Sequence, residues 1–111
     1  SRAYVFVRSN KQLKKIIFEQ ILFIESMENY VIINTQSSKD IVSIPLKQFG
    51  VILPQSSFMQ VHRSYIVNIN KIDAVTGNQL KIGDKILPIG RSQREDVKRI
   101  LGSYIISPKK E

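Results

Sequence analysis

One stretch sets the pattern of the whole chain: Val61-His62-Arg63-Ser64-Tyr65-Ile66-Val67-Asn68. A polar, donor-rich triplet interrupts apolar residues that suit a β-strand, which places the triplet at a strand end. Arg63 carries a planar fork of donors that matches O6 and N7 of a guanine, and Ser64 beside it can reach a phosphate or a base edge. An isolated His-Arg-Ser is more often just the polar, solvent-exposed part of a turn. The interpretation of these residues as DNA contacts therefore depends on the rest of the chain.

The composition is strongly basic. Seventeen Lys and Arg residues face nine Asp and Glu residues, which gives a net charge of +8 on 111 residues and a pI of about 9.9. A nucleic-acid binder carries such a charge, but RNA, an anionic lipid surface and an acidic protein would also be attracted by it. The length allows one domain with a core that needs no covalent cross-links.

Several classes of protein are disfavoured. The chain has no cysteine and one histidine, and it contains neither a P-loop nor a Gly-x-Gly-x-x-Gly motif. The four carboxylates Asp73, Asp84, Glu95 and Asp96 are expected in hairpins or in a capped helix rather than around a Mg²⁺ ion. Apolar runs such as 21–24 are far shorter than the roughly 20 residues that cross a bilayer, and no signal peptide is visible. We therefore expect no enzyme activity, no catalytic residue, no cofactor and no metal site.

The first half of the chain is dominated by strand patterns. Residues 4–7 and 13–17 predict a hairpin around a polar turn. Residues 20–25 and 30–35 are again apolar and β-branched, and Ser26-Met27-Glu28-Asn29 between them is predicted to be a loop. Residues 36–40 are expected to form a polar turn.

The spacing of apolar residues changes from a strand pattern to a helix pattern after residue 44. The short alternating run 41–44 stops at Pro45, which cannot donate to a strand ladder. Apolar residues then recur at helical spacing, which predicts a short helix over 46–53 that Pro54 ends, although Gly50 lies inside it.

The C-terminal third predicts three short strands and a helix. The dipeptides Gly77-Asn78 and Gly83-Asp84 suit tight hairpin turns between β-like segments. Ser92 and Glu95 have the spacing of a capping box. The stripe that follows is predicted to be core and consists of Val97, Ile100, Leu101 and Tyr104. Residues 107–111 are expected to be a frayed tail.

The order of the motifs resembles the LytTR domain of bacterial transcriptional regulators. The matching segments are Ile24-Glu25-Ser26-Met27-Glu28-Asn29-Tyr30-Val31, then Leu46-Lys47, then Phe58 and Val61 to Asn68 with Lys71-Ile72, then Leu87-Pro88-Ile89-Gly90-Arg91-Ser92. The resemblance spans about residues 4–101, and its most specific part is the His-Arg-Ser segment.

This resemblance implies the fold class and the function. The fold would be mostly β, a β-rich α+β domain: an elongated antiparallel sandwich of short strands, with one short middle helix and a C-terminal helix. Residues 1–111 would form one such domain. It would bind duplex DNA in a sequence-specific way as the cytoplasmic output domain of a regulator. Two copies would bind repeated half-sites, and an upstream receiver or membrane-sensor domain would belong to the full-length protein.

The resemblance also implies which residues contact DNA. Three loops would enter successive major grooves, carrying Asn29 with Tyr30, Arg63 with Ser64, and Arg91. Further candidates are Lys47 for a phosphate, His62 as a brace of the loop or a phosphate contact, and Ser92 and Arg94 beside Arg91. For Asn29 the alternative is a plain turn former, and Tyr30 stacks on a base or belongs to the core.

Two residues depart from the family pattern. Gly90 stands where the family often has serine, which predicts a more flexible turn and a less precise Arg91. Glu28 places a carboxylate near DNA phosphates, which repel it unless it accepts from a cytosine amine.

A second function is a β-rich module that binds single-stranded nucleic acid. Such a module needs exposed aromatic rings beside a basic track. Core packing is expected instead for all five phenylalanines, Phe6, Phe18, Phe23, Phe49 and Phe58, which argues against this alternative.

Overall fold

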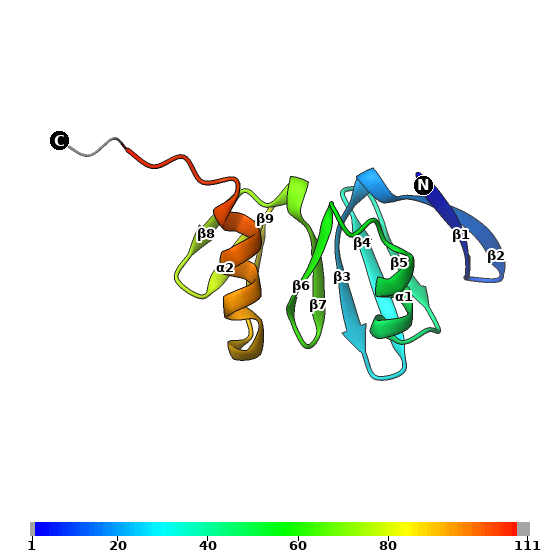
Figure 1. Ribbon diagram of the computed structural model, residues 1–111. Coiled ribbons are helices and arrows are strands. Elements are labelled where there is room, and N and C mark those ends of the chain that lie inside the picture. Colours follow the sequence, from blue (N-terminus) through cyan, green and yellow to red (C-terminus); the bar gives the residue numbers. More distant parts are fainter. Residues whose placement is uncertain (1, 109–111) are drawn as a thin grey trace.

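The centre of the molecule is a five-stranded antiparallel sheet with the strand order β5-β4-β3-β7-β6 (Figure 1). Its strands are β3 (Ile21–Met27), β4 (Tyr30–Thr35), β5 (Lys39–Val42), β6 (Phe58–His62) and β7 (Tyr65–Asn68). The structure is a computed structural model and describes residues 2–108. Because successive side chains of a strand point to opposite faces, this sheet presents apolar side chains on both sides.

The first core lies on one face of the central sheet. It is covered by the hairpin of β1 (Tyr4–Ser9) and β2 (Gln12–Ile17), by the short 3-10 turn η1 (Phe18–Gln20), and by helix α1 (Leu46–Ile52). The buried side chains on this side include Ile24, Ile33, Phe49, Phe58 and Ile66. Gly50 lets α1 approach closely, since a Cβ there would lie 3.0 Å from Cδ1 of Ile66.

The second core lies on the opposite face. The covering elements are a three-stranded sheet of β8 (Ala74–Thr76), β9 (Gln79–Ile82) and β10 (Lys85–Pro88), the turns η2 (Ile69–Lys71) and η3 (Arg91–Gln93), and helix α2 (Arg94–Gly102). Phe23 and Val67 of the central sheet pack here. The register of β3 shifts between Ile21 and Phe23, and this bulge directs Ile21 to one core and Phe23 to the other.

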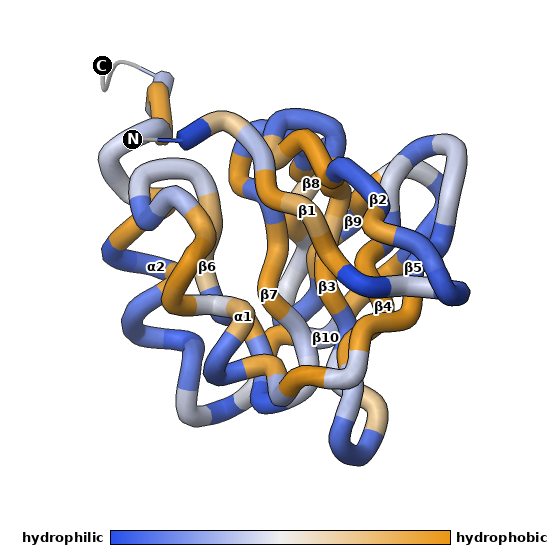
Figure 2. The backbone as a smooth tube through the Cα atoms, turned by 90° about the vertical axis from the view of Figure 1, so that its right-hand side faces the viewer, coloured by the Kyte–Doolittle hydropathy of each residue, from blue (hydrophilic) through white to orange (hydrophobic). Residues whose placement is uncertain are grey.

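The expected fold class is confirmed. The molecule is strand-rich and elongated, with extents of 60 × 26 × 26 Å, and its hydropathy alternates between apolar strands and polar loops (Figure 2). The middle helix, the N-terminal hairpin and the three C-terminal strands are present. Gly77 and Gly83 sit in the two predicted turns, each with φ +60°. The tail expected over 107–111 is exposed and irregular at Ser107 and Pro108, and 109–111 lie outside the described residues.

Two strand boundaries were predicted wrongly. Strand β3 continues to Met27, so the expected four-residue loop shrinks to a turn of Glu28 and Asn29. The expected turn over 36–40 ends earlier, because β5 begins at Lys39. Asp40 is polar and still lies buried within this strand, since its carboxylate pairs with Lys14 at 2.8 Å. A charge can therefore occupy a strand when an ion pair compensates its burial.

The start of the C-terminal helix was also predicted wrongly. Ser92 lies in the 3-10 turn η3, and α2 begins after Gln93 without any side-chain cap. Gln93 N–H already donates to Gly90 O at 3.0 Å, so the chain turns before the helix begins. Glu95 and Asp96 instead lie in the first turn of α2, where their negative charges interact favourably with the positive end of the helix dipole.

Two aromatic residues expected in the core are exposed. Phe6 is 59% accessible and Tyr104 is 63% accessible, whereas the other four phenylalanines are buried as expected. Tyr104 lies two residues beyond the end of α2 at Gly102 and so leaves the apolar stripe of the helix. Phe6 lies on the outer side of β1, where the burial pattern alternates between exposed and buried residues.

The packing of α1 can be tested by truncation. Phe49→Ala should lower the free energy of unfolding by about 3–5 kcal/mol, because it removes a fully buried ring from the first core. Val51→Ala on the same helix is the matched control, since Val51 is 77% exposed, and it should change the stability by about 0.5 kcal/mol or less. Urea unfolding of both variants measures the difference. Equal losses would contradict the burial of this face of α1.

Candidate nucleic-acid interface

Three loops lie along one long edge of the molecule, at the bottom of Figure 1. They are the β3–β4 turn (28–29), the β6–β7 turn (63–64) and the β10–α2 segment (90–93). We call this side the loop edge. Each of the three carries candidate residues from the sequence, so the fold brings together groups that are far apart in the chain.

The β6–β7 turn presents Arg63 at its tip. His62 and Tyr65 form the last strand pair before the turn. Ser64 N–H donates to Nδ1 of His62 at 3.0 Å, and the Gln60 side chain donates to His62 O at 3.2 Å. The His62 ring also lies 5.5 Å from the Tyr65 ring. His62 therefore braces the turn from below, while Arg63 is exposed and Ser64 half-buried.

Backbone hydrogen bonds tie this turn to its neighbours on both sides. Ser26 N–H donates to Ser64 O at 2.8 Å, which joins it to the end of β3. On the other side Gly90 N–H donates to Val61 O at 2.7 Å. The relative positions of the loops are thus set by main-chain groups and do not depend on the candidate side chains.

Gly90 is bonded on both sides. Its N–H donates to Val61 O at 2.7 Å, and its carbonyl accepts from Gln93 N–H at 3.0 Å. A Cβ at this position would be in ordinary contact with Cα of His62 at 3.4 Å, and only the mobile amide end of the Gln93 side chain would have to move aside. The flexibility expected of the turn before Arg91 stays a prediction.

The arginines of the loop edge are open to solvent. Arg63, Arg91 and Arg94 are exposed, and within residues 2–108 none of them forms an ion pair. Arg91 begins η3, Ser92 beside it is exposed, and Arg94 is the first residue of α2. Donors that are neither buried nor paired remain available to a ligand.

The β3–β4 turn is tight and contributes Asn29. Its side chain is exposed, and the preceding Glu28 adopts a left-handed φ of 56°. Such a conformation is costly for a residue with a Cβ. Tyr30 opens β4 opposite Met27 and is half-buried, so part of its ring belongs to the sheet surface.

Tyr65 and Glu25 face each other across β3 and β7. Burial raises the pKa of the Tyr65 hydroxyl, and the negative charge of Glu25 acts in the same direction. The hydroxyl is therefore protonated at neutral pH. Its ring packs edge-on against Phe23 at 6.2 Å, which anchors β7 directly after the Arg63 turn.

Lys47 lies on helix α1 and not in one of the three loops. It is exposed on α1 and lines a groove with Gln60, Asp96 and Ile100, between α1 and α2.

Three residues that position the loop edge were missed by the sequence analysis: Ser26, Gln60 and Gln93. Gln60 is polar within an apolar strand and could have been noticed, whereas Ser26 acts through its backbone, which no residue type reveals.

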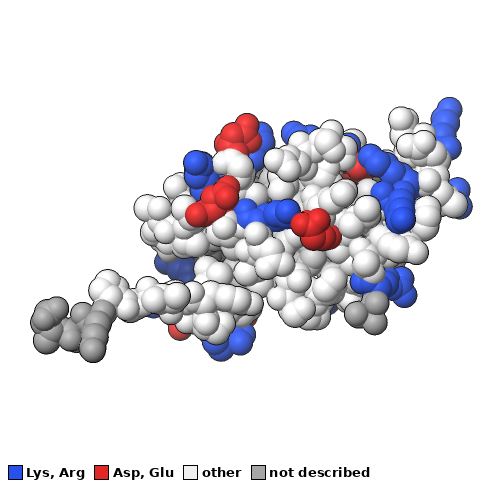
Figure 3. Space-filling model, turned by 90° about the horizontal axis from the view of Figure 1, so that it is seen from above, with Lys and Arg blue, Asp and Glu red and all other residues white. Residues whose placement is uncertain are grey.

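Charged side chains also cover the side of the molecule opposite the loop edge. Figure 3 looks onto the opposite long side, where acidic and basic side chains are interspersed.

Among the described residues no cluster of three or more His, Cys, Asp or Glu side chains is placed to hold a metal ion. Neither described helix has the length and hydropathy needed to cross a membrane.

Comparisons with known proteins show the family of the chain. The sequence model of the LytTr DNA-binding domain matches residues 11–102. The sensory transduction proteins LytT of Bacillus anthracis and Bacillus cereus are each 32% identical over 90 residues, which cover 75% of this chain and 36% of the relative. The chain thus spans about a third of the length of these relatives.

A solved structure has the same fold. The LytTr DNA-binding domain of a response regulator from Bacillus cereus superposes with a TM-score of 0.80 at 23% identity, covering 92% of this chain and 99% of that one. The match of the family model over most of the chain and the identity to the LytT proteins decide the assignment. The chain belongs to the LytTr DNA-binding domain family.

Proposed function

We propose that this chain is the output domain of a bacterial transcriptional regulator and binds duplex DNA in a sequence-specific way. The loop edge enters successive major grooves, one loop to each. The observation that carries the proposal is that Arg63 and Arg91 are exposed, without ion pairs within residues 2–108, and held by loops that main-chain bonds tie together. A preorganised donor loses less conformational freedom on binding.

The side chains divide into those that read bases and those that hold phosphates. Arg63 and Arg91 suit a bidentate contact with guanine, and Asn29 suits adenine. Tyr30, which is half-buried, would stack on a base with the exposed part of its ring. Contacts with phosphate, which fix the register on the duplex, are assigned to the remaining candidates: Lys47, His62, Ser64, Ser92 and Arg94.

The whole regulator extends beyond this chain in our proposal. Residues 1–111 act as one DNA-binding domain in the cytoplasm, and two copies bind repeated half-sites. A receiver or sensor domain that precedes the chain supplies the signal, in keeping with the greater length of the LytT relatives. The domain needs no cofactor and catalyses no reaction.

Binding of single strands is the second candidate function, favoured by one observation. Tyr4 and Phe6 are exposed, and Lys15 Nζ lies 4.3 Å above the Tyr4 ring. Gel shifts of duplex and single-stranded probes, each with and without Mg²⁺, separate the candidates. A preference for the single strand would favour this second function, and cleavage of either probe would contradict the absence of enzyme activity.

The reading role of the arginines predicts a loss of specificity. Arg63→Ala and Arg91→Ala should each weaken binding to the preferred duplex by about 1–3 kcal/mol, because a bidentate base contact is lost. Binding to a scrambled duplex should weaken much less. Arg63→Lys should not restore specificity, since an ammonium lacks the planar fork.

Titration of both duplexes at one fixed salt concentration measures this difference, with the duplex first selected from a random library. Both residues are exposed, so thermal unfolding should be nearly unchanged. Equal losses on the two duplexes would reduce the arginines to phosphate contacts, and a large drop in melting temperature would make them structural.

Lys47 is predicted to contribute through a phosphate alone. Lys47→Ala should weaken all duplexes about equally and should reduce the slope of log affinity against log salt by about one unit. Lys98, exposed on α2, should behave in the same way. A changed base preference with an unaltered salt slope would show that Lys47 reads a base.

The surroundings of Gly90 predict that alanine is tolerated there. In Gly90→Ala the new methyl group would lie in ordinary contact with the His62 backbone at 3.4 Å, and only the mobile amide end of the Gln93 side chain would have to move. The φ of -68° at Gly90 also suits alanine, so the affinity for the preferred duplex should stay unchanged, as for the control Gly102→Ala. A loss of affinity of about tenfold with Gly90→Ala alone would show that a glycine is needed to position Arg91.

A further inference from the structure

The end of the molecule formed by β1 and β2 carries apolar surface without a cover. Figure 2 looks onto this end, which is distant from α2 in Figure 1. Tyr4, Phe6 and Leu13 are 46%, 59% and 59% exposed, and Ile52 of α1 is 40% exposed. Large apolar side chains that gather on one surface mark a site of interaction.

A groove runs along β1 at this end. It has a volume of about 1060 Å³ and lies between residues 2–8 on one side and β5, its following loop and α1 on the other. Val42, Ile44 and Phe49 are among the apolar residues that line it. Among residues 2–108 no acidic side chain lines the groove, whereas Arg2 and Arg8 stand at the two ends of the wall formed by residues 2–8.

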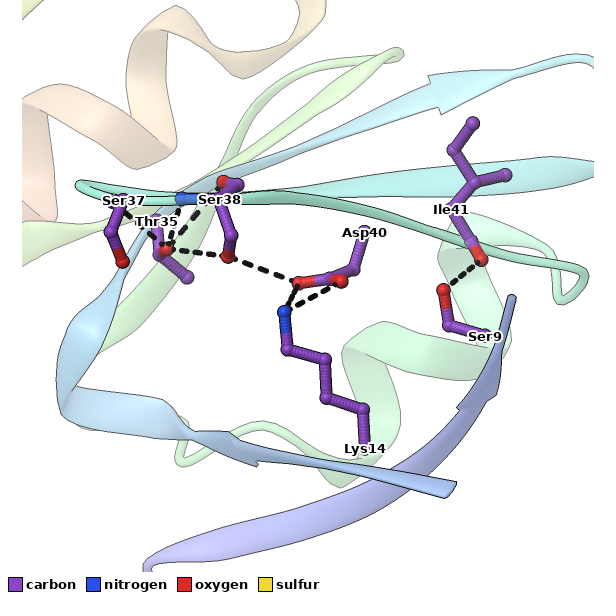
Figure 4. Close-up of polar contacts among 7 residues, drawn as sticks. All are labelled: Ser9, Lys14, Thr35, Ser37, Ser38, Asp40 and Ile41. Atoms are coloured by element: carbon purple, nitrogen blue, oxygen red, sulfur yellow. Dashed lines mark hydrogen bonds and ion pairs between the residues drawn. The ribbon is translucent and has the colours of Figure 1, made fainter. Parts of the chain in front are cut away.

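A polar clamp closes the groove where the hairpin turns (Figure 4). Ser9 Oγ donates to Ile41 O at 3.0 Å, and Lys14 Nζ lies 2.8 and 2.9 Å from the two carboxylate oxygens of Asp40. Ser38 Oγ donates to the same carboxylate at 3.1 Å. These contacts hold the turn end of β1 against β5 and leave the N-terminal part of β1 standing apart.

The open side of β1 offers unpaired main-chain groups. Backbone groups of successive residues in a strand point to alternate edges. Phe18 N–H donates to Ala3 O at 3.0 Å, so Ala3 and every second residue after it face β2. The main-chain groups of Tyr4 and Phe6 then point to the other edge of β1, along the groove, while their side chains lie on the outer side of the strand. Within residues 2–108 β1 pairs with no strand other than β2.

We propose that this groove binds an extended segment of a partner protein, which adds as a strand to the free edge of β1. The segment carries apolar side chains at alternate positions, which pack on the half-buried Ile44 and the exposed Ile52, and acidic side chains toward its ends, which pair with Arg2 and Arg8. Residues 2–8, which form one wall of the groove, span about 20 Å. A bound strand that pairs along this whole wall would have a similar length. Main-chain bonds supply affinity and the pockets for alternate side chains supply specificity.

Other occupants fit less well. A second copy would bring another basic surface against Arg2 and Arg8, because the chain carries a net charge of +8. A single-stranded nucleic acid would satisfy the arginines and the exposed rings, but it would leave the strand edge of β1 and the aliphatic wall without partners. Strand addition at the groove is independent of duplex binding, because the groove and the loop edge share no residue.

Selection from a random peptide library displayed on phage, panned on the whole chain, tests the proposal. Enriched peptides should be acidic with alternating apolar residues. Their affinity, measured by fluorescence anisotropy, should fall about tenfold or more with Phe6→Ala, because an aromatic anchor is lost. Arg8→Glu should weaken them too, and the amides of Tyr4 and Phe6 should become protected from hydrogen exchange.

The controls separate peptide binding at the groove from a loss of folding, from nucleic-acid binding and from self-association. Phe6 is exposed, so Phe6→Ala should keep the melting temperature and the duplex affinity unchanged. Ile86→Ala is the matched variant, with a side chain 54% exposed on β10, and it should not affect the peptides. The proposal is overturned if no peptide is enriched, if peptide binding survives Phe6→Ala, or if the amides stay unprotected. It is also overturned if Phe6→Ala instead abolishes binding of oligothymidylate or self-association in sedimentation.

Discussion

Burial of the central sheet on both faces is the constraint on which the rest of the structure depends. An antiparallel sheet of five short strands can leave one face in water, but here β3 and β7 send large apolar side chains to both sides. Each face therefore needs its own cover. The N-terminal hairpin with α1 supplies one and the C-terminal sheet with α2 the other, which makes the molecule long and leaves the strand ends free for loops.

The stacking of two cores around one sheet also explains how the loops are aligned. The segment before α2 belongs to the cover of the second core, yet Gly90 is bonded directly to β6 of the central sheet. The β3–β4 and β6–β7 turns are ends of strands in that same sheet. All three loops are thus attached to the central sheet, and this sheet sets the spacing between the side chains at their tips.

Much of this could be predicted from the sequence, because the strands alternate strongly and their turns carry marked residues. The hairpin turns at Gly77 and Gly83 and the helix after Pro45 follow from local chemistry. The failures came where a hydrogen bond or ion pair that residue types do not reveal overrides the expected local pattern. Asp40 entered a strand because Lys14 neutralises it, and Ser92 lost its capping role because Gly90 and Gln93 close a turn first.

The candidate site was predictable in part for a similar reason. Arginine, serine and asparagine at predicted strand ends can be recognised in the sequence, and the family resemblance indicated which of them are candidate site residues. The bonds that align the loops involve backbone atoms of Ser26, Val61 and Gly90, which leave no trace in residue type. The exposure of Phe6 was missed because an apolar strand at the end of a sheet has the same pattern as one in the core.

The main-chain bonds between the loops have an evolutionary consequence. Since Ser64 and Val61 hold their neighbours through carbonyl oxygens, most substitutions at Arg63 leave the scaffold intact. Under the proposed function, stability depends on the backbone and the cores, whereas recognition depends on a few exposed side chains at the loop tips. A single exchange at one tip would then change the preferred DNA sequence while the domain stays folded.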